Sequence, residues 1–286
     1  MVTGSTSGIG RETARALAQR GARVVLVSRN AEKCAATMEQ IKKQTGNAQV
    51  DYLAADLSAQ AEIPDLVQRF HQRYDRLDVL INNAGGFFLS RRESVDGIEM
   101  TFALNHLNYF LLTNLLLDTL IASGKPGAAS RIINVSSDAH RGSRINFNDL
   151  QMKRRYNGME AYGQSKLANV LFTYELDRRL AAAGVKEKVT ANALHPGFVR
   201  TNLAGDNGPL VRIIMRLVYV IAGRSPEQGA ETTVYLASSP EVEGISGKYF
   251  VDCEPVKTDP ASYDEETAKR LWEVSAQMVD LKPEIT

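Results

Sequence analysis

Short apolar runs rich in β-branched residues alternate with longer segments of helical periodicity, and this alternation constrains the fold more than any other feature of the sequence. The apolar runs are residues 24–27, 50–54, 79–81, 132–135, 190–194 and 249–251. The helical segments are residues 9–20, 31–43, 63–74, 97–122 and 161–183, with expected stops at Gly21, Gly46, Gly124 and Gly184. Because parallel strands need helical crossovers, this order predicts an α/β fold with a doubly wound parallel sheet and helices on both of its faces.

The apolar runs indicate how deeply the predicted sheet is buried. Val24-Val25-Leu26-Val27 is apolar at every position, as expected for a strand that is covered on both faces. No linker or internal repeat interrupts the alternation, and 286 residues suit one α/β domain. We therefore expect a single Rossmann-type domain over residues 1–286.

Charge and cysteine content exclude several classes of function. A formal net charge of +1 gives no basic field for nucleic acid. Cys34 and Cys253 lie far apart and outside any CxxC or Cys/His cluster, so we expect neither a zinc site nor a disulfide framework, and a reducing, cytoplasmic setting. No uninterrupted apolar run reaches about 18 residues, so we expect no membrane span. The first residues also lack the pattern of a signal peptide.

A glycine-rich turn follows a first, very short predicted strand, Met1-Val2-Thr3. Its sequence is Thr3-Gly4-Ser5-Thr6-Ser7-Gly8-Ile9-Gly10, and a predicted helix begins within it. Glycines let the backbone approach a pyrophosphate, and the start of the helix faces the negative charge. Such a turn also arises merely to pack a helix against a strand, so this motif needs support from others.

The second predicted strand ends in Ser28-Arg29, without the acidic residue that an NAD-specific protein usually places there. A guanidinium group can bind a 2′-phosphate through a charge-assisted fork. We therefore expect a preference for NADP(H), with NAD(H) as the alternative cofactor. The competing interpretation is that Arg29 is a solvated surface charge.

Two further motifs carry groups suited to proton transfer. Tyr162 and Lys166 are four residues apart, which places them about one turn apart on one face of a helix. A nearby ammonium group can lower the pKa of a tyrosine from about 10 towards neutrality. Alone, this spacing is also typical of a solvent-facing pair. Asn134-Val135-Ser136-Ser137 ends a predicted strand, where open α/β sheets place their binding crevices and where a hydroxyl group could polarise a carbonyl.

Taken together, the motifs resemble those of the short-chain dehydrogenase/reductase family. They are the TGxxxGxG spacing of residues 3–10, Asn82-Asn83-Ala84-Gly85, residues 134–137, residues 162–166 and Pro196-Gly197, in that family's order. The resemblance spans nearly the whole chain and is greatest for the retinol dehydrogenase and WW-domain oxidoreductase branch. It rests there on His195-Pro196-Gly197, Ser165-Lys166-Leu167-Ala168-Asn169 and Ser246-Gly247-Lys248-Tyr249-Phe250.

The resemblance implies hydride transfer between NADP(H) and a carbonyl or alcohol, without a metal. Tyr162 would be the general acid/base, and Lys166 would lower its pKa while binding the nicotinamide ribose. Ser137 would hydrogen-bond the substrate oxygen, and Asn105 would support a proton-relay water. With Arg29 included, the expected cofactor-binding residues are Gly4, Ser7, Gly8, Ile9, Gly10, Arg29, Asp56, Leu57, Asn83, Ala84, Gly85, Tyr162, Lys166, Pro196, Gly197, Val199 and Thr201.

The alternation of strands and helices fades after Pro196, where residues 201–224 form a predicted insertion. Within it, residues 209–222 place Leu210, Ile214, Leu217 and Ile221 on one helical stripe. We expect a lid over an apolar substrate pocket. An interfacial segment that touches a membrane and a plain packing helix are the alternatives. With Phe87-Phe88-Leu89, this stripe predicts an apolar substrate such as a retinoid, a steroid-like molecule or an aldehyde.

The resemblance also implies a homodimer formed through residues 97–122 and 161–183. Two other functions suit the same fold. One is a non-catalytic NADP(H)-binding sensor or scaffold, since a fold alone does not define a function. The other is an NADPH-dependent double-bond reductase. The complete set of Asn105, Ser137, Tyr162 and Lys166 argues against the sensor.

Overall fold

A single twisted sheet forms the centre of the protein, in a computed structural model that describes residues 1–199, 207 and 223–282. Its strand order is β3-β2-β1-β4-β5-β6-β7-β8. The described strands pair in parallel apart from the antiparallel β7–β8 pair. Their bounds are β1 Val2–Thr3, β2 Val24–Ser28, β3 Val50–Ala54, β4 Val79–Asn82, β5 Ser130–Val135, β6 Val189–Leu194, β7 Tyr249–Val251 and β8 Glu254–Pro255. The predicted doubly wound, Rossmann-type sheet is confirmed.

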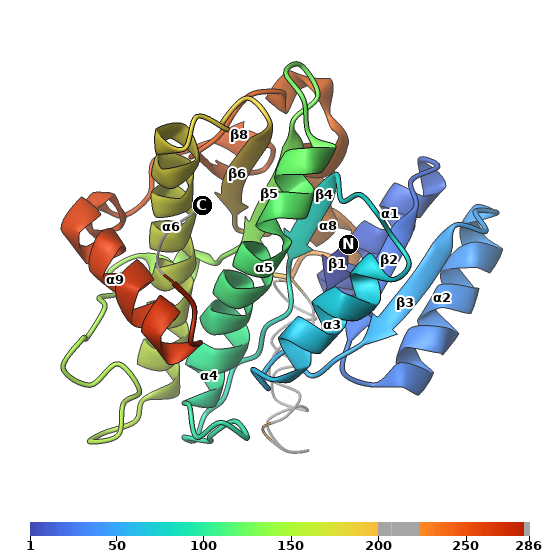
Figure 1. Cartoon of the computed structure of the whole chain (residues 1–286). Coiled ribbons are helices and arrows are strands. Elements are labelled where there is room, and N and C mark those ends of the chain that lie inside the picture. Colours follow the sequence, from blue (N-terminus) through green and yellow to red (C-terminus); the bar gives the residue numbers. More distant parts are fainter. Residues whose placement is uncertain (200–206, 208–222, 283–286) are drawn as a thin grey trace.

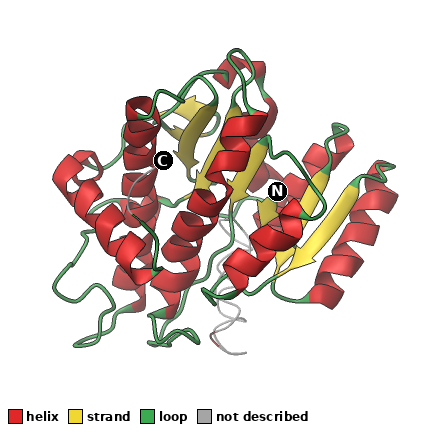
Figure 2. Cartoon of the chain, viewed as in Figure 1, coloured by secondary structure: helices red, strands yellow, loops and turns green. Residues whose placement is uncertain are grey.

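Helices cover both faces of the sheet (Figure 2). One buried apolar cluster joins the sheet to α1, α2 and α8, and another joins its opposite face to α3, α5 and α6. The described α-helices are α1 Gly8–Gln19, α2 Ala31–Thr45, α3 Glu62–His71, α4 Met100–Phe102, α5 Asn108–Ser123, α6 Gly158–Ala182, α8 Pro226–Ser238 and α9 Glu265–Met278. The shorter helices are the π-helix η1 Ala103–Leu107 and the 3₁₀ turns η2 Asp138–His140, η4 Pro240–Val242 and η5 Pro260–Tyr263.

Local capping explains where the long helices begin and end. The Asn30 side chain accepts a hydrogen bond from the backbone nitrogen of Lys33, and α2 ends at Gly46, whose φ of 72° is left-handed. The Asn157 side chain accepts from the backbone nitrogens of Met159 and Glu160. Helix α6 therefore starts at residue 158, three residues before the predicted start at residue 161.

The helix expected over residues 97–122 is interrupted, which corrects that prediction. The Glu99 carboxylate caps the start of α4 by accepting from the backbone nitrogens of Thr101 and Phe102. The backbone then widens into the π-helix η1 before α5 begins at residue 108. Such π-turns are frequent at functional sites, and this one carries Asn105. Hydrophobic periodicity gives no signal for it.

Two helices near the carboxyl end were not predicted, although each has a recognisable start. Helix α8 begins with a capping box between Ser225 and Gln228, and α9 begins with Asp264 as its cap. Helix α9 lies outside the sheet against α6 and α5 (Figure 1). Its Trp272 stacks on Phe172 with ring centroids 5.6 Å apart. It therefore covers part of the helical layer on that side of the sheet.

Most of the predicted lid, residues 201–224, lies outside the described residues, which include only Asn207, Gly223 and Arg224 of that range. Thr201 and the stripe of residues 209–222 lie outside them as well. Among the described helices, none has the length and apolar content needed to cross a membrane.

Candidate active site

A cavity of about 790 Å³ opens at the carboxyl ends of the parallel strands. Loops that follow β1 to β6 all contribute to its wall. The expected site residues on this wall are Gly4, Ser7, Gly8, Ile9, Gly10, Arg29, Asp56, Leu57, Asn83, Ala84, Gly85, Ser137, Tyr162, Lys166, Pro196, Gly197 and Val199. Asn105 lies behind the wall. The sheet therefore brings together motifs that are spread over almost two hundred residues of sequence.

The glycine-rich turn packs tightly against the loop that follows β4. Gly4 has a φ of +65°, and a Cβ atom there would lie 2.8 Å from the Cα atom of Ala84. A Cβ atom on Gly10 would lie 2.5 Å from both the Gly4 carbonyl oxygen and Asn83 Nδ2. Asn83 Nδ2 donates to the carbonyl oxygen of Thr3 at 2.8 Å. Because these glycines lack a Cβ atom, the backbones of two loops of the cavity wall can pack directly against each other.

The start of helix α1 opens into this cavity. Ser7, the cap residue, has extended backbone angles, and among the described residues no side chain hydrogen-bonds to the N–H groups of the first turn as a cap. The first N–H groups of a helix need acceptors, and the helix dipole favours negative charge there. This uncapped helix start and the adjacent glycines fit the pyrophosphate of a dinucleotide.

Positive charge lines the end of the cavity beside β2. The side chain of Arg29 is 70% exposed, and its Nη1 atom lies 3.9 Å from an Asp56 carboxylate oxygen. Ser28, Asn30 and Lys33 line the same end. The sequence analysis did not include Lys33 among the cofactor-binding residues. Asn30 could have indicated it, because a cap at Asn30 starts α2 and places Lys33 in the first turn of that helix. Two cations therefore border this part of the cavity.

Lys166 is buried at the base of the cavity, with only 3% of its surface exposed. Its Nζ atom donates to the Val135 carbonyl oxygen at 3.0 Å and lies 5.5 Å from the centre of the Tyr162 ring. Burial lowers the pKa of the Lys166 ammonium group to about 7. The hydroxyl group of Tyr109 donates to the same carbonyl oxygen at 3.4 Å. The end of β5 thus holds Lys166 beside Tyr162.

The two adjacent serines after β5 differ in their surroundings. Ser136 is buried, and its hydroxyl group donates to the Lys166 carbonyl oxygen at 2.8 Å. Ser137 is half-buried, and its Oγ atom accepts from the backbone nitrogen of Ala139 at 3.2 Å. An accepting hydroxyl group keeps its own proton for donation. Ser137 is therefore better placed than Ser136 to donate a hydrogen bond into the cavity.

Asn105 links the loop after β4 to α6. Its Oδ1 atom accepts from the Gly86 nitrogen at 2.8 Å, and its Nδ2 atom donates to the Gly86 oxygen and to Ser165 Oγ, each at 3.0 Å. The backbone carbonyl oxygen of Asn105 accepts from Asn169 Nδ2 at 2.8 Å. Because both ends of its amide group are engaged with the protein, the side chain of Asn105 acts here as a structural tie.

A buried chain of amide groups lies beneath the cavity. Asn82 Nδ2 donates to Asn134 Oδ1, and Asn134 Nδ2 donates to Thr173 Oγ1, both at 2.9 Å. These contacts join the carboxyl ends of β4 and β5 to α6. Asn82 and Asn134 therefore serve the frame of the site, while Asn83 and Ser137 line its wall.

Apolar side chains form part of the cavity wall. The Phe87 ring meets the Tyr162 ring edge-on, with centroids 5.7 Å apart. Further apolar lining residues are Phe88, Met100, Leu104, Met159 and Phe198. Asn207 donates from Nδ2 to the Phe87 carbonyl oxygen at 2.6 Å. Phe87 thus makes the cavity wall beside Tyr162 apolar.

Comparison with known proteins settles the family. The family model described as short chain dehydrogenase matches residues 1–209. The chain belongs to the short-chain dehydrogenase family. It is 41% identical to human polyprenol dehydrogenase over 278 residues, which cover 97% of this chain and 84% of that protein. It is 43% identical to human retinol dehydrogenase 13 over 287 residues, 99% of this chain and 84% of that protein.

A solved structure supports the same conclusion. The NADP active-site complex of Pseudomonas aeruginosa RhlG matches with a TM-score of 0.68 and 27% identity, over 91% of this chain and 94% of that one. The resemblance to retinol dehydrogenases predicted from the motifs is confirmed by the relatives. This short-chain dehydrogenase is thus an NAD(P)-dependent oxidoreductase that acts on CH–OH or C=O groups.

Proposed function

We propose that this short-chain dehydrogenase interconverts an apolar alcohol and its carbonyl compound with NADP(H), using Tyr162 as general acid/base. The observation that carries the proposal is that Tyr162, Ser137 and the uncapped start of α1 line one cavity, with Lys166 beside the tyrosine ring. When bound, the nicotinamide cofactor donates or accepts the hydride. The protein supplies orientation and the proton.

The proton moves between the Tyr162 hydroxyl group and the substrate oxygen. During reduction Tyr162 donates this proton, and during oxidation its phenolate accepts one. The Lys166 ammonium group favours the phenolate by its charge. Because a phenolate in turn favours the protonated lysine, the two groups titrate as a pair. Ser137 donates a hydrogen bond to the same substrate oxygen, and Asn105 holds the wall in place through Gly86 and Ser165.

Ser7 to Gly10 would hold the pyrophosphate of the cofactor at the start of α1. Arg29 and Lys33 bind the 2′-phosphate of the adenine ribose, which gives the preference for NADP(H) over NAD(H). Asp56 and Leu57 contact the adenine. The remaining contacts to the cofactor would come from Gly4, Asn83, Ala84, Gly85, Tyr162, Lys166, Pro196, Gly197, Val199 and Thr201. The NADP complex of RhlG, a structural neighbour, supports this choice of cofactor.

The substrate is an apolar alcohol or aldehyde that reaches Tyr162 along Phe87, Met159 and Phe198. Two relatives are named for retinol and for polyprenols, which are long apolar alcohols. Both facts favour a retinoid or a comparable chain over a small polar carbonyl. Residues 201–224 act as the lid, which Asn207 joins to the wall at Phe87 and Leu89.

The homodimer and the cytoplasmic setting stay predictions. Residues 97–122 and 161–183 were expected to form the dimer contact. Because α9 packs against α5 and α6, a twofold contact through these helices would include α9. Light scattering of the purified protein would decide the dimer: a monomeric mass contradicts it.

Titration and turnover together test the proposed function. The quenching of tryptophan fluorescence by NADPH and NADH measures both affinities, and NADPH should bind more tightly. Retinaldehyde, decanal and glyceraldehyde are then offered with NADPH, and the products are analysed. Oxidation of NADPH with formation of retinol or decanol supports the proposal.

The other outcomes point elsewhere. Turnover of glyceraldehyde alone would refute the apolar substrate. Reduction of a carbon–carbon double bond in retinaldehyde would favour the double-bond reductase. Tight NADPH binding without turnover of any of the three would favour the sensor or scaffold.

A further inference from the structure

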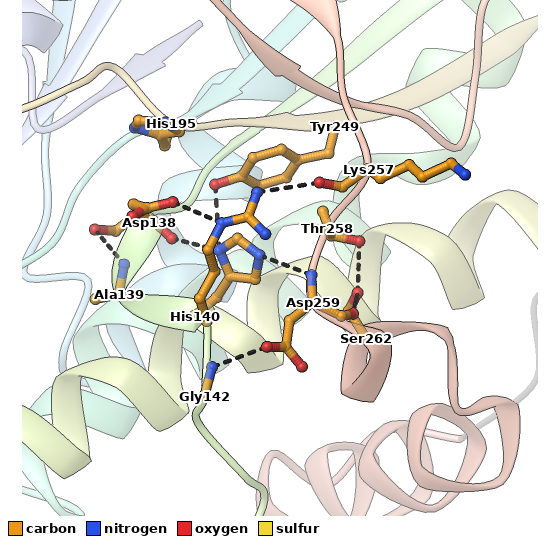
Figure 3. A network of polar contacts seen from close by, with 12 residues as sticks. Asp138, Ala139, His140, Gly142, His195, Tyr249, Lys257, Thr258, Asp259 and Ser262 are labelled. Carbon is orange, nitrogen blue, oxygen red and sulfur yellow. Dashed lines mark hydrogen bonds and ion pairs between the residues drawn. The ribbon is translucent and has the colours of Figure 1, made fainter.

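The loop of residues 138–143 follows Ser137 of the active site and contacts a segment that lies more than a hundred residues further along the chain. The loop begins with the 3₁₀ turn η2, which Ser137 caps. Figure 3 shows that residues 257–262, here called the C-terminal clamp, lie directly against this loop. None of the clamp residues lines the cavity, so their contacts reach the site indirectly, through this loop and through the Thr258 contact with Tyr174 of α6.

His140 stands at the centre of these contacts and is fully buried. Its Nδ1 atom lies 2.7 Å from the Ser137 carbonyl oxygen, and its Nε2 atom accepts from the Asp259 backbone nitrogen at 3.4 Å. A carbonyl oxygen only accepts and a backbone N–H only donates, so the ring is neutral with its proton on Nδ1. Burial lowers the pKa of His140, in agreement with a neutral ring. One imidazole thus bridges Ser137 and the clamp.

The clamp holds the loop through two further hydrogen bonds. Asp259 accepts through Oδ2 from the Gly142 nitrogen at 2.9 Å. The Lys257 carbonyl oxygen accepts from Arg141 Nη2 at 3.1 Å. Asp259 also caps the turn η5 by accepting from the Ala261 nitrogen, which stiffens the clamp itself. The loop therefore depends on the clamp at three successive residues.

The opposite side of the loop touches α6 next to the catalytic tyrosine. A Cβ atom on Gly163 would overlap the Ser143 hydroxyl group and lie 2.9 Å from the Ala139 carbonyl oxygen. Gly163 directly follows Tyr162, so the loop rests on the backbone that carries the tyrosine. A shift of the loop would change the separation of Ser137 and Tyr162.

Tyr249 supports the histidine ring from β7. The rings of His140 and Tyr249 have centroids 5.0 Å apart, and Tyr249 also stacks on His195 at 6.2 Å. His195 accepts through Nδ1 from the nitrogen of Gly197, which lines the cavity. The surroundings of His140 thus reach the cavity wall at a second point.

We propose that His140 is a positioning residue, held by the C-terminal clamp, that sets the Ser137 hydroxyl group at its working distance from Tyr162. The inference rests on the role proposed above for Ser137. Misplacement of a catalytic group by about 1 Å can cost about 100-fold in rate, so the orientation of Ser137 affects kcat strongly. The glycine-rich turn and the loop after β2, which are proposed to hold the phosphates of the cofactor, make no described hydrogen bond with the clamp, so cofactor affinity should change little.

Substitution of His140 tests the bridge. In His140→Ala we expect kcat for retinaldehyde to fall about 30-fold, while the NADPH Kd changes less than about threefold. His140→Asn should recover most of the loss, because its Nδ2 atom can take the place of Nδ1 as donor to Ser137. His140→Phe keeps the ring without the donor and should remain slow. An unchanged kcat in His140→Ala, or an asparagine variant as slow as alanine, would overturn the proposal.

The clamp is tested by two matched aspartates. Asp259 and Asp264 each cap a helix near the carboxyl end, but only Asp259 contacts the loop. Asp259→Ala should lower kcat and speed hydrogen–deuterium exchange in residues 138–143, whereas Asp264→Ala should do neither. Equal effects of the two variants would overturn the role of the clamp. The exchange measurement needs no substrate.

Ser137→Ala separates the inference from the proposed function. If Ser137→Ala turns over at the wild-type rate, the role of Ser137 is wrong and the inference falls with it. If Ser137→Ala is slow while His140→Ala is fast, only the inference is wrong. Slow turnover in both variants, with recovery in His140→Asn, supports both.

Discussion

The side-chain nitrogen of Lys166 lies 5.5 Å from the centre of the Tyr162 ring, one turn further along α6, and donates to the backbone of β5 at Val135. This arrangement ties the lysine to the sheet and leaves its charge within reach of a phenolate. Burial of that charge is costly, and the pKa of Lys166 falls to about 7. The proposed proton transfer and the cost in stability can therefore be measured separately.

Lys166→Met should change the pH dependence of stability. In the unfolded chain the lysine pKa is about 10.4, so between about pH 7 and pH 10 the unfolded state binds a proton that the folded state lacks. Unfolding then becomes less favourable as pH rises, by up to about 1.4 kcal/mol per pH unit. Urea denaturation at pH 7, 8 and 9 should show this rise in the wild type and its reduction in Lys166→Met.

An exposed lysine serves as the control for this measurement. Lys248 is exposed at the start of β7, so Lys248→Met should follow the wild-type pH dependence. A constant difference in unfolding free energy between wild type and Lys166→Met from pH 7 to pH 9 would contradict the lowered pKa.

Tyr162→Phe should abolish most turnover while it leaves the cofactor site intact. The substitution removes the proton donor but keeps the ring that packs on Phe87, so we expect kcat to fall by about 100-fold or more. NADPH titration should give a Kd close to that of the wild type. Tyr74→Phe, at a tyrosine that binds Asp51 away from the cavity, is the control and should keep its activity. Wild-type turnover in Tyr162→Phe would refute the assigned acid/base.

The sequence predicts the strands of the sheet well because its buried parallel strands are short runs that are rich in apolar residues. Residues 50–54 and 249–251 were predicted with the bounds that β3 and β7 have. Helix α9 and the π-helix around Asn105 are harder to predict, since they make long-range contacts with α6: Trp272 with Phe172, and Asn105 with Ser165. The strands and their burial follow from local patterns, whereas the outer helix and the π-turn do not.

The same distinction applies to the site. Tyr162 and Lys166 are related by helical spacing, and the glycine turn is contiguous, so both are visible in the sequence. The link between His140 and Asp259 joins residues 119 positions apart, and no local pattern signals it. The role of Asn105 as support for a proton-relay water stays a prediction, and the hydrogen bonds between its amide group and Gly86 are contacts that only the fold brings about.

Trp272→Ala should show how much α9 contributes to stability. The indole is 2% exposed, stacks on Phe172, and lies under the Arg179 guanidinium at 4.4 Å. Removing a buried tryptophan side chain costs about 3–5 kcal/mol, which urea denaturation would measure. Lys269→Ala, an exposed change on the same helix, should cost less than about 0.5 kcal/mol. Similar losses in both variants would mean that α9 is held by something other than its aromatic contacts.

Arg29→Asp should shift the cofactor preference from NADPH towards NADH. The change removes the cation that would hold the 2′-phosphate and places a carboxylate beside Asp56, so two like charges would face the phosphate. We expect the ratio of kcat/KM for NADPH to that for NADH to fall by about 30-fold or more, equivalent to about 2 kcal/mol.

Lys33→Ala removes the second cation at the same end of the cavity and should lower the ratio by about fivefold. Arg20→Asp, whose side chain contacts Ser238 outside the cavity, should leave the ratio unchanged. A ratio that is unchanged in both Arg29→Asp and Lys33→Ala would show that the phosphate is recognised elsewhere on the wall.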